Sequence, residues 1–258
     1  GLIEAYGALG ADENRLRVLR RKRDFVDSIL EKFRLSVQEA EILHALGETK
    51  EMLDVLARTL PLAEVTDEPA WREARDQFAE EAAFIANEQE DGSAGINLLR
   101  ALAAMEAKGA PSQALRRYNQ ASALAENRFS DTRLAVELLE EARLLEPTDP
   151  DTIANLDRIL DATEQYPKKV ALLRDLADLA LASKQEEQAL TLLVEMGGTQ
   201  RTRLEDTGSA LETYKEALEL RPDYPPALEA VRDCIRSDDE AGTGRFMLAD
   251  AYKRSGDD

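Results

Sequence analysis

The chain has only one cysteine, Cys234, and only one histidine, His44, among its 258 residues. A single cysteine excludes a disulfide framework within the chain, which fits a reducing compartment. The same scarcity excludes metal sites built from clusters of histidine and cysteine, and the two residues cannot form a catalytic pair unless the chain folds back on itself. We therefore expect both residues to have structural roles on helices.

Motifs for catalysis and cofactor binding are also missing. The sequence contains no HExxH, CxxC, GxxxxGKS/T or Asp-rich calcium loop. Its glycine-rich positions, Gly92 and Gly197-Gly198, lack the preceding strand that a phosphate-binding loop requires. The sequence therefore predicts a protein that is not an enzyme and that needs no cofactor or metal.

Long apolar stretches, glycine and proline are scarce as well. The longest apolar runs are far too short to span a bilayer, and no signal peptide opens the chain. We expect no membrane insertion and a cytoplasmic location, while a targeting sequence that preceded Gly1 would not be seen. The 13 glycines and 9 prolines fall between apolar runs, and strong helix formers dominate elsewhere. No alternating strand pattern is present, so the sequence predicts an all-α fold.

Positive charge is in short supply, because 33 lysines and arginines stand against 52 acidic residues, which gives a formal net charge of −19. Such a surface repels phosphate backbones, so we expect no nucleic-acid binding and favour a basic protein partner. The imbalance is uneven, with a net charge of −1 in residues 1–60, −7 in residues 61–110 and −11 in residues 111–258.

Apolar residues recur at helical spacing along most of the chain. They predict about 14 helices, near residues 2–9, 12–33, 36–46, 49–60, 68–88, 93–107, 112–127, 132–145, 150–163, 167–182, 185–196, 208–220, 225–236 and 241–254. Glycine and proline mark the expected breaks between helices. The main breaks are expected at Gly10, Gly47, Pro61, Asp91-Gly92, Gly109-Ala110-Pro111 and Gly197-Gly198.

Two segments that lie 75 residues apart align without a gap. Residues 129–147 read FSDTRLAVELLEEARLLEP, and residues 204–222 read LEDTGSALETYKEALELRP. In each, two alanines seven residues apart lie on one helix stripe, where they allow a neighbouring helix to approach closely. A larger apolar side chain fills the space beside them, and a proline ends the helix. These anchor residues are Ala135, Leu139, Ala142 and Pro147 in the first segment and Ala210, Tyr214, Ala217 and Pro222 in the second.

The anchors resemble the second helix of the tetratricopeptide repeat family, in its degenerate form similar to the repeats of long bacterial scaffold proteins. The family's second helix carries a small residue, a large apolar or aromatic residue four positions later, an alanine three positions after that and a closing proline. The resemblance implies a right-handed α-solenoid of antiparallel helix hairpins, in which about 14 helices form about seven hairpins.

The resemblance also implies a groove on the concave face, lined by the first helix of each hairpin. The partner-binding residues expected there are Arg117, Gln120, Asn127, Asn155 and Glu195, with Leu124, Thr152, Ile159 and Thr199 beside them. Ordinary solvent exposure is the alternative role for each. A subclass of the family clamps a peptide carboxylate with lysines and asparagines, and Gln120 and Leu124 occupy two of those positions. We therefore expect no such clamp.

One basic stretch runs against the acidic trend. Residues 15–23 read RLRVLRRKR, and on a helix the two leucines face inward while the basic side chains spread over more than half of the circumference. One interpretation is a solvated face that pairs with acidic neighbours. A second is a docking patch for an acidic protein or another copy of the chain, made of Arg17, Arg20, Arg21 and Arg23. A nucleic-acid site is the third, and the absence of aromatic residues and the acidic remainder of the chain disfavour it.

The sequence divides into three expected parts. These are N-terminal helix pairs in residues 1–60, an irregular helical segment or seam in residues 61–110, and repeats in residues 111–258 that continue into further sequence. The predicted function is a non-catalytic scaffold that binds a peptide or protein partner in its groove. The alternative is an architectural or self-associating spacer of a larger multidomain protein, and a catalytic or small-ligand domain is a third hypothesis.

Overall fold

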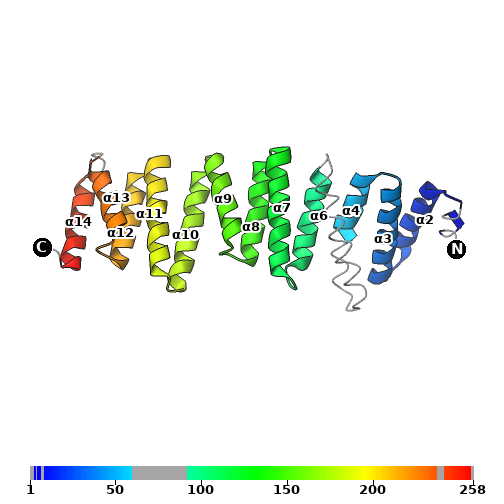
Figure 1. Ribbon diagram of the computed structural model, residues 1–258, viewed down its shortest axis with the longest axis horizontal. Coiled ribbons are helices and arrows are strands. Elements are labelled where there is room, and N and C mark those ends of the chain that lie inside the picture. The colour runs from blue at the N-terminus through cyan, green and yellow to red at the C-terminus, as the bar shows by residue number, and fades with distance from the viewer. Residues whose placement is uncertain (1–2, 4, 7–8, 60–91, 237–240, 257–258) are drawn as a thin grey trace. The chain divides into compact units, whose positions relative to one another are not determined.

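The computed structural model describes residues 3, 5–6, 9–59, 92–236 and 241–256. All regular structure in these residues is helical and none is a strand, which confirms the all-α prediction. The predicted helix near 68–88 lies outside the described residues, and the one near 2–9 lies only partly within them, so the count of about 14 stays a prediction. The helices (Figure 1) are α2 Asp12–Phe25, α3 Ile29–Ala45, α4 Thr49–Thr59, α6 Gly92–Glu106, α7 Pro111–Phe129, α8 Thr132–Leu145, α9 Pro150–Ala162, α10 Tyr166–Ala182, α11 Glu186–Arg203, α12 Thr207–Leu220, α13 Pro225–Arg236 and α14 Ala241–Ser255.

The chain forms two compact units, residues 1–156 and residues 157–258. In the first unit, α2 packs on α3, α3 on α4, α4 on α6, α6 on α7 and α7 on α8, and in the second unit each helix from α10 to α13 packs on the one that follows it. Helices joined by a short described loop, such as α6 and α7 or α10 and α11, run in opposite directions (Figure 1). In the second unit α11 also contacts α13, and α12 contacts α14. These contacts are those of a helical repeat. The domain boundaries expected near residues 60 and 110 stay predictions.

The helix starts recur with the 75-residue spacing of the sequence. Helices α7 to α10 begin at Pro111, Thr132, Pro150 and Tyr166, and α11 to α14 begin 75 residues later at Glu186, Thr207, Pro225 and Ala241. The repeating unit therefore consists of four helices.

The two aligned segments form α8 and α12, which begin with the same cap. Asp131 Oδ1 accepts a hydrogen bond from the Leu134 backbone N–H at 3.0 Å, and Asp206 Oδ1 accepts one from the Ser209 N–H at 2.9 Å. An aspartate in this position satisfies one of the amides that a helix start leaves unpaired. The aspartate that both segments share is thus the start signal of each helix.

The anchor side chains of these two helices lie in the core, as predicted. Each is at most 1% exposed: Ala135, Leu139, Ala142, Ala210, Tyr214 and Ala217. Each helix stops two residues before its proline, and the residue between them is extended. A proline disfavours helical backbone in the residue before it, so the sequence motif also sets the helix end.

The predicted boundary between the helices at 12–33 and 36–46 is wrong. The structure ends α2 at Phe25 and starts α3 at Ile29, so the break lies near residue 27. The reason is a cap, because Ser28 Oγ accepts a hydrogen bond from the Glu31 N–H at 3.4 Å. A serine followed three residues later by a glutamate is a start signal, which hydrophobic spacing alone overlooked.

The break predicted at Gly197-Gly198 is also wrong, since α11 continues through both glycines to Arg203. The absence of a side chain at Gly197 makes room for the Tyr214 ring of α12. A Cβ atom at Gly197 would lie 2.8 Å from Cζ and 2.9 Å from Cδ1 of that ring, and closer still to Cε1. Gly197 therefore marks a close approach of two helices and does not end one. Burial of the ring also raises the pKa of Tyr214 to about 12.

Substituting each of the two neighbouring glycines tests this close approach. Gly197→Ala should lower the free energy of unfolding, because overpacking costs about 1–3 kcal/mol and exceeds the roughly 1 kcal/mol that alanine contributes within a helix. Gly198→Ala is the matched control, since no atom lies within 4 Å of a Cβ there, and it should stabilise the protein. Urea denaturation measures both. Equal gains in stability would contradict the close packing.

The cap at Asp206 makes stability depend on pH. The hydrogen bond from the Ser209 N–H lowers the pKa of Asp206 below its ordinary 3.8. The charged form therefore contributes stability above pH 3.8, and this contribution is lost as the pH falls through the lowered pKa. Asp206→Ala should lower the melting temperature at pH 7, with a deficit that shrinks below pH 4. Asp206→Asn keeps an uncharged cap and should lower the melting temperature at pH 7 less than Asp206→Ala does. A deficit of Asp206→Ala that does not change with pH would contradict this account.

Candidate functional site

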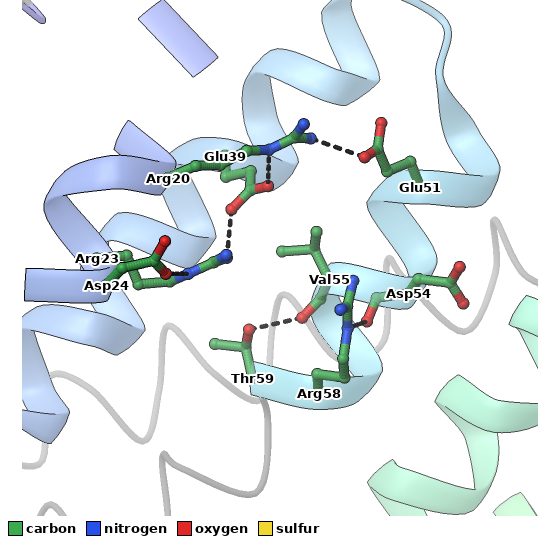
Figure 2. Close-up of polar contacts among 9 residues, drawn as sticks. All are labelled: Arg20, Arg23, Asp24, Glu39, Glu51, Asp54, Val55, Arg58 and Thr59. Carbon is green, nitrogen blue, oxygen red and sulfur yellow. Dashed lines mark hydrogen bonds and ion pairs between the residues drawn. The ribbon is translucent and has the colours of Figure 1, made fainter. Parts of the chain in front are cut away.

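Two arginines of the basic stretch on α2 are bound to Glu39 of α3 (Figure 2). Arg20 Nε donates to Glu39 Oε1 at 2.6 Å, and Arg23 Nη1 donates to Glu39 Oε2 at 2.5 Å. Glu39 is buried, with 3% of its side chain exposed, while the side chains of Arg20 and Arg23 are 38% and 31% exposed. One buried carboxylate thus joins α2 to α3 through two charge-assisted hydrogen bonds.

Arg20 extends this ion-pair network to a third helix. Its Nη2 donates to Glu51 Oε1 of α4 at 2.8 Å. Burial alone lowers the pKa of Arg20, but its hydrogen bonds and charge interactions with Glu39 and Glu51 outweigh burial and raise the pKa. Arg20 therefore stays charged and holds three helices together.

The predicted basic docking patch is divided by this network. Arg17 and Arg21 are exposed on α2, one helical turn apart, whereas Arg20 and Arg23 are engaged with Glu39. The interpretation that the basic stretch pairs with acidic neighbours therefore describes Arg20 and Arg23. Docking of a partner on Arg17 and Arg21 stays a prediction.

Two of the predicted groove residues lie together on α7. Gln120 and Asn127 are exposed and line a hollow of about 380 Å³ with Ala123, Leu124 and Arg128. Carboxamides can donate to and accept from a peptide backbone, and the apolar side chains between them can cover an apolar residue of a ligand. This face of α7 thus has the chemistry to bind a peptide.

Arg117 and Asn155 are held by neighbouring side chains of the first unit. Arg117 is 15% exposed, and its Nε lies 3.6 Å from Glu106 Oε2. Asn155 Nδ2 of α9 donates to Asn119 Oδ1 of α7 at 3.0 Å, and Asn119 Nδ2 donates to Thr152 Oγ1 at 3.1 Å. Asn119 was not among the predicted groove residues, although a polar residue beside the buried stripe of a helix is a signal for a hydrogen bond to the neighbouring helix.

The expectation that Thr152, Ile159 and Thr199 line the groove is wrong. They are 0%, 1% and 8% exposed, respectively. Thr152 and Ile159 are seven residues apart and therefore share the stripe of α9 that faces the core. The Thr199 hydroxyl donates within its own helix, to the Glu195 carbonyl at 3.0 Å. Buried threonines of this kind satisfy their hydroxyls locally and are not available to a ligand.

Glu195, the remaining predicted groove residue, belongs to an ion cluster of the second unit. Its centre is Lys169 of α10, which is 6% exposed. Lys169 Nζ lies 2.8 Å from Asp157 Oδ1, 2.8 Å from Asp161 Oδ2 and 3.6 Å from Glu195 Oε1. Burial alone lowers the pKa of Lys169, but hydrogen bonds to the two aspartates outweigh burial and raise the pKa. The burial of Lys169 was not predicted, because its acidic partners lie on two other helices, α9 and α11.

The groups most suited to catalysis do not come together in the described residues. His44 is exposed on α3, and Cys234 is buried on α13, where burial raises the pKa of the thiol. In the described ranges, no three His, Cys, Asp or Glu residues are grouped so that they could hold a metal ion. Among the described helices, none is both long and apolar enough to cross a bilayer.

No protein-family model matches this chain, and no curated protein matches it significantly.

Neutralising Glu39 tests the network that joins α2, α3 and α4. Glu39→Gln should lower the free energy of unfolding by about 1–3 kcal/mol, because a buried carboxylate that accepts from two cations is lost. Glu51→Gln is the matched control, since its side chain is 49% exposed, and it should cost less than about 1 kcal/mol. Chemical denaturation measures both variants. Equal costs would contradict a special role for Glu39.

Proposed function

We propose that this chain is a non-catalytic scaffold of tetratricopeptide-like repeats that binds a peptide or protein partner. The observation that carries the proposal is the 75-residue recurrence of four helices, with alanine anchors at matching positions. Stacked helix hairpins of this kind provide extended surfaces that suit protein recognition better than enclosed chemistry. We further propose the right-handed superhelix that such repeats form.

The binding surface that we propose in the first unit is the hollow on α7 beside Gln120 and Asn127. Both carboxamides are exposed there beside Leu124, so a bound segment could combine backbone hydrogen bonds with apolar contact. The net charge of −19 favours a basic partner over nucleic acid. A cytoplasmic, bacterial scaffold is the setting that fits the composition and the repeat type.

A second candidate function is that of an architectural or self-associating segment. Four large apolar side chains on the described surface favour it, namely Leu9, Phe25, Leu144 and Phe246, which are 77%, 79%, 84% and 77% exposed. Covering an exposed apolar side chain of this size with another protein or another copy is favourable. This function predicts assembly that depends on concentration and involves no foreign partner.

An affinity capture experiment tests the groove proposal. The chain is used as bait in native lysate, and the bound proteins are identified by mass spectrometry. We expect Gln120→Ala with Asn127→Ala to reduce capture of a specific partner at least about tenfold, since two interfacial hydrogen-bonding groups are lost. Asn155 is left intact because it binds Asn119 within the fold.

The matched control is Glu137→Ala with Glu140→Ala, which removes two exposed side chains from α8. This control should retain capture. Partners that bind both double variants as well as the wild type would contradict the groove proposal. Recovery of the bait alone, together with larger assemblies at higher concentration in sedimentation experiments, would favour the self-associating function.

A further inference from the structure

A second hollow lies among α2, α3 and α4, and its lining is rich in cations. It has a volume of about 390 Å³ and is lined by Arg23, Asp24, Lys32, Ser36, Val55, Arg58 and Thr59. The volume is within the range of sites that hold small ligands or single side chains of a partner. Each of the three helices contributes one cationic side chain, so the hollow concentrates positive charge on a strongly acidic protein.

Two of the cations in this hollow have fixed orientations (Figure 2). Arg23 is held by Glu39 at 2.5 Å, and its Nε lies 3.9 Å from Asp24 Oδ1. Arg58 Nε donates to the Asp54 backbone carbonyl at 3.0 Å, which fixes the plane of its guanidinium group. Preorganised cations of this kind lose little side-chain freedom when they bind an anion.

The charge of the hollow selects the class of anion. Its described lining contributes three positive charges and one negative charge, and the network that holds Arg23 adds one positive charge from Arg20 and two negative charges from Glu39 and Glu51. One net positive charge therefore remains. A single carboxylate balances this charge, whereas a phosphate dianion would leave an excess of negative charge. The Thr59 hydroxyl donates to the Val55 carbonyl at 2.6 Å, so the donors left for the anion are Lys32 and Arg58.

We propose that this hollow binds a carboxylate side chain from an acidic segment of a partner protein. Arg58 can hold a carboxylate with two parallel hydrogen bonds, and Lys32 adds a third donor from the facing helix. A nucleic acid does not fit, because the rest of the chain repels its long run of phosphates. The inference rests on the proposed function: a partner that is basic overall uses one short acidic segment as a second contact, at a site separate from the hollow on α7.

A dye-labelled hexaglutamate peptide is a direct probe of this site, with binding to the full chain measured by fluorescence anisotropy. Lys32→Gln with Arg58→Gln should weaken binding at least about tenfold, since it removes both donors of the site. The matched control is Arg17→Gln with Arg21→Gln, which removes the same charge from the exposed face of α2. That control should change the affinity by less than about threefold, as expected for exposed charges that salt screens and that do not line the hollow.

Three results would overturn the inference. These are equal weakening by the two double variants, no saturable binding to the wild type, and displacement of the peptide by inorganic phosphate at lower concentration than by acetate. Lys32→Gln alone provides a second test, because its half-buried side chain is not part of the core. Thermal melting monitored by circular dichroism establishes that each variant is folded.

The variant Gln120→Ala with Asn127→Ala separates this inference from the proposed function. It should leave hexaglutamate binding unchanged while it reduces capture of the groove partner. If this variant loses capture of the partner but still binds hexaglutamate, the two sites act independently. The groove proposal and the carboxylate proposal can then fail separately.

Discussion

Close approach between helices is the constraint on which the rest of this structure depends. The helices of each unit pack on their neighbours in chain order, and alanine or glycine stands where a larger side chain would separate them. At Gly197 the requirement is strict, because the Tyr214 ring occupies the space of a Cβ atom. The two blocks of four helices share buried alanines at matching positions, Ala135 and Ala142 on α8 and Ala210 and Ala217 on α12.

Polar side chains add specific pairing to this packing. The buried side chains of Glu39 and Lys169 and the half-buried side chain of Asn119 each join two or more helices. Their burial makes an unpaired group costly, so they favour one arrangement of neighbouring helices over others. The side chains left exposed, such as Gln120 and Asn127 on α7, are therefore displayed on a fixed frame, which is what a scaffold requires.

Much of the fold could be predicted from local sequence, and much of the candidate site could not. The shared aspartates, alanines and prolines correctly predicted α8 and α12, because caps, packing stripes and helix ends are local signals. The break predicted at the glycine pair in α11 is wrong, because the Tyr214 ring, seventeen residues after Gly197, is what requires a glycine there. The ion pairs of Arg20 and Arg23 and the burial of Lys169 likewise depend on distant partners, which spacing along one helix cannot reveal.

A double-mutant cycle between Gly197 and Tyr214 tests this account most directly. The four unfolding free energies are those of the wild type, Gly197→Ala, Tyr214→Leu and the double variant. If close approach limits the packing of α11 on α12, Gly197→Ala should destabilise the wild type but cost nothing in the Tyr214→Leu background, with a coupling of at least about 1 kcal/mol. Additive effects of the two substitutions would contradict the claim that this contact sets the helix spacing.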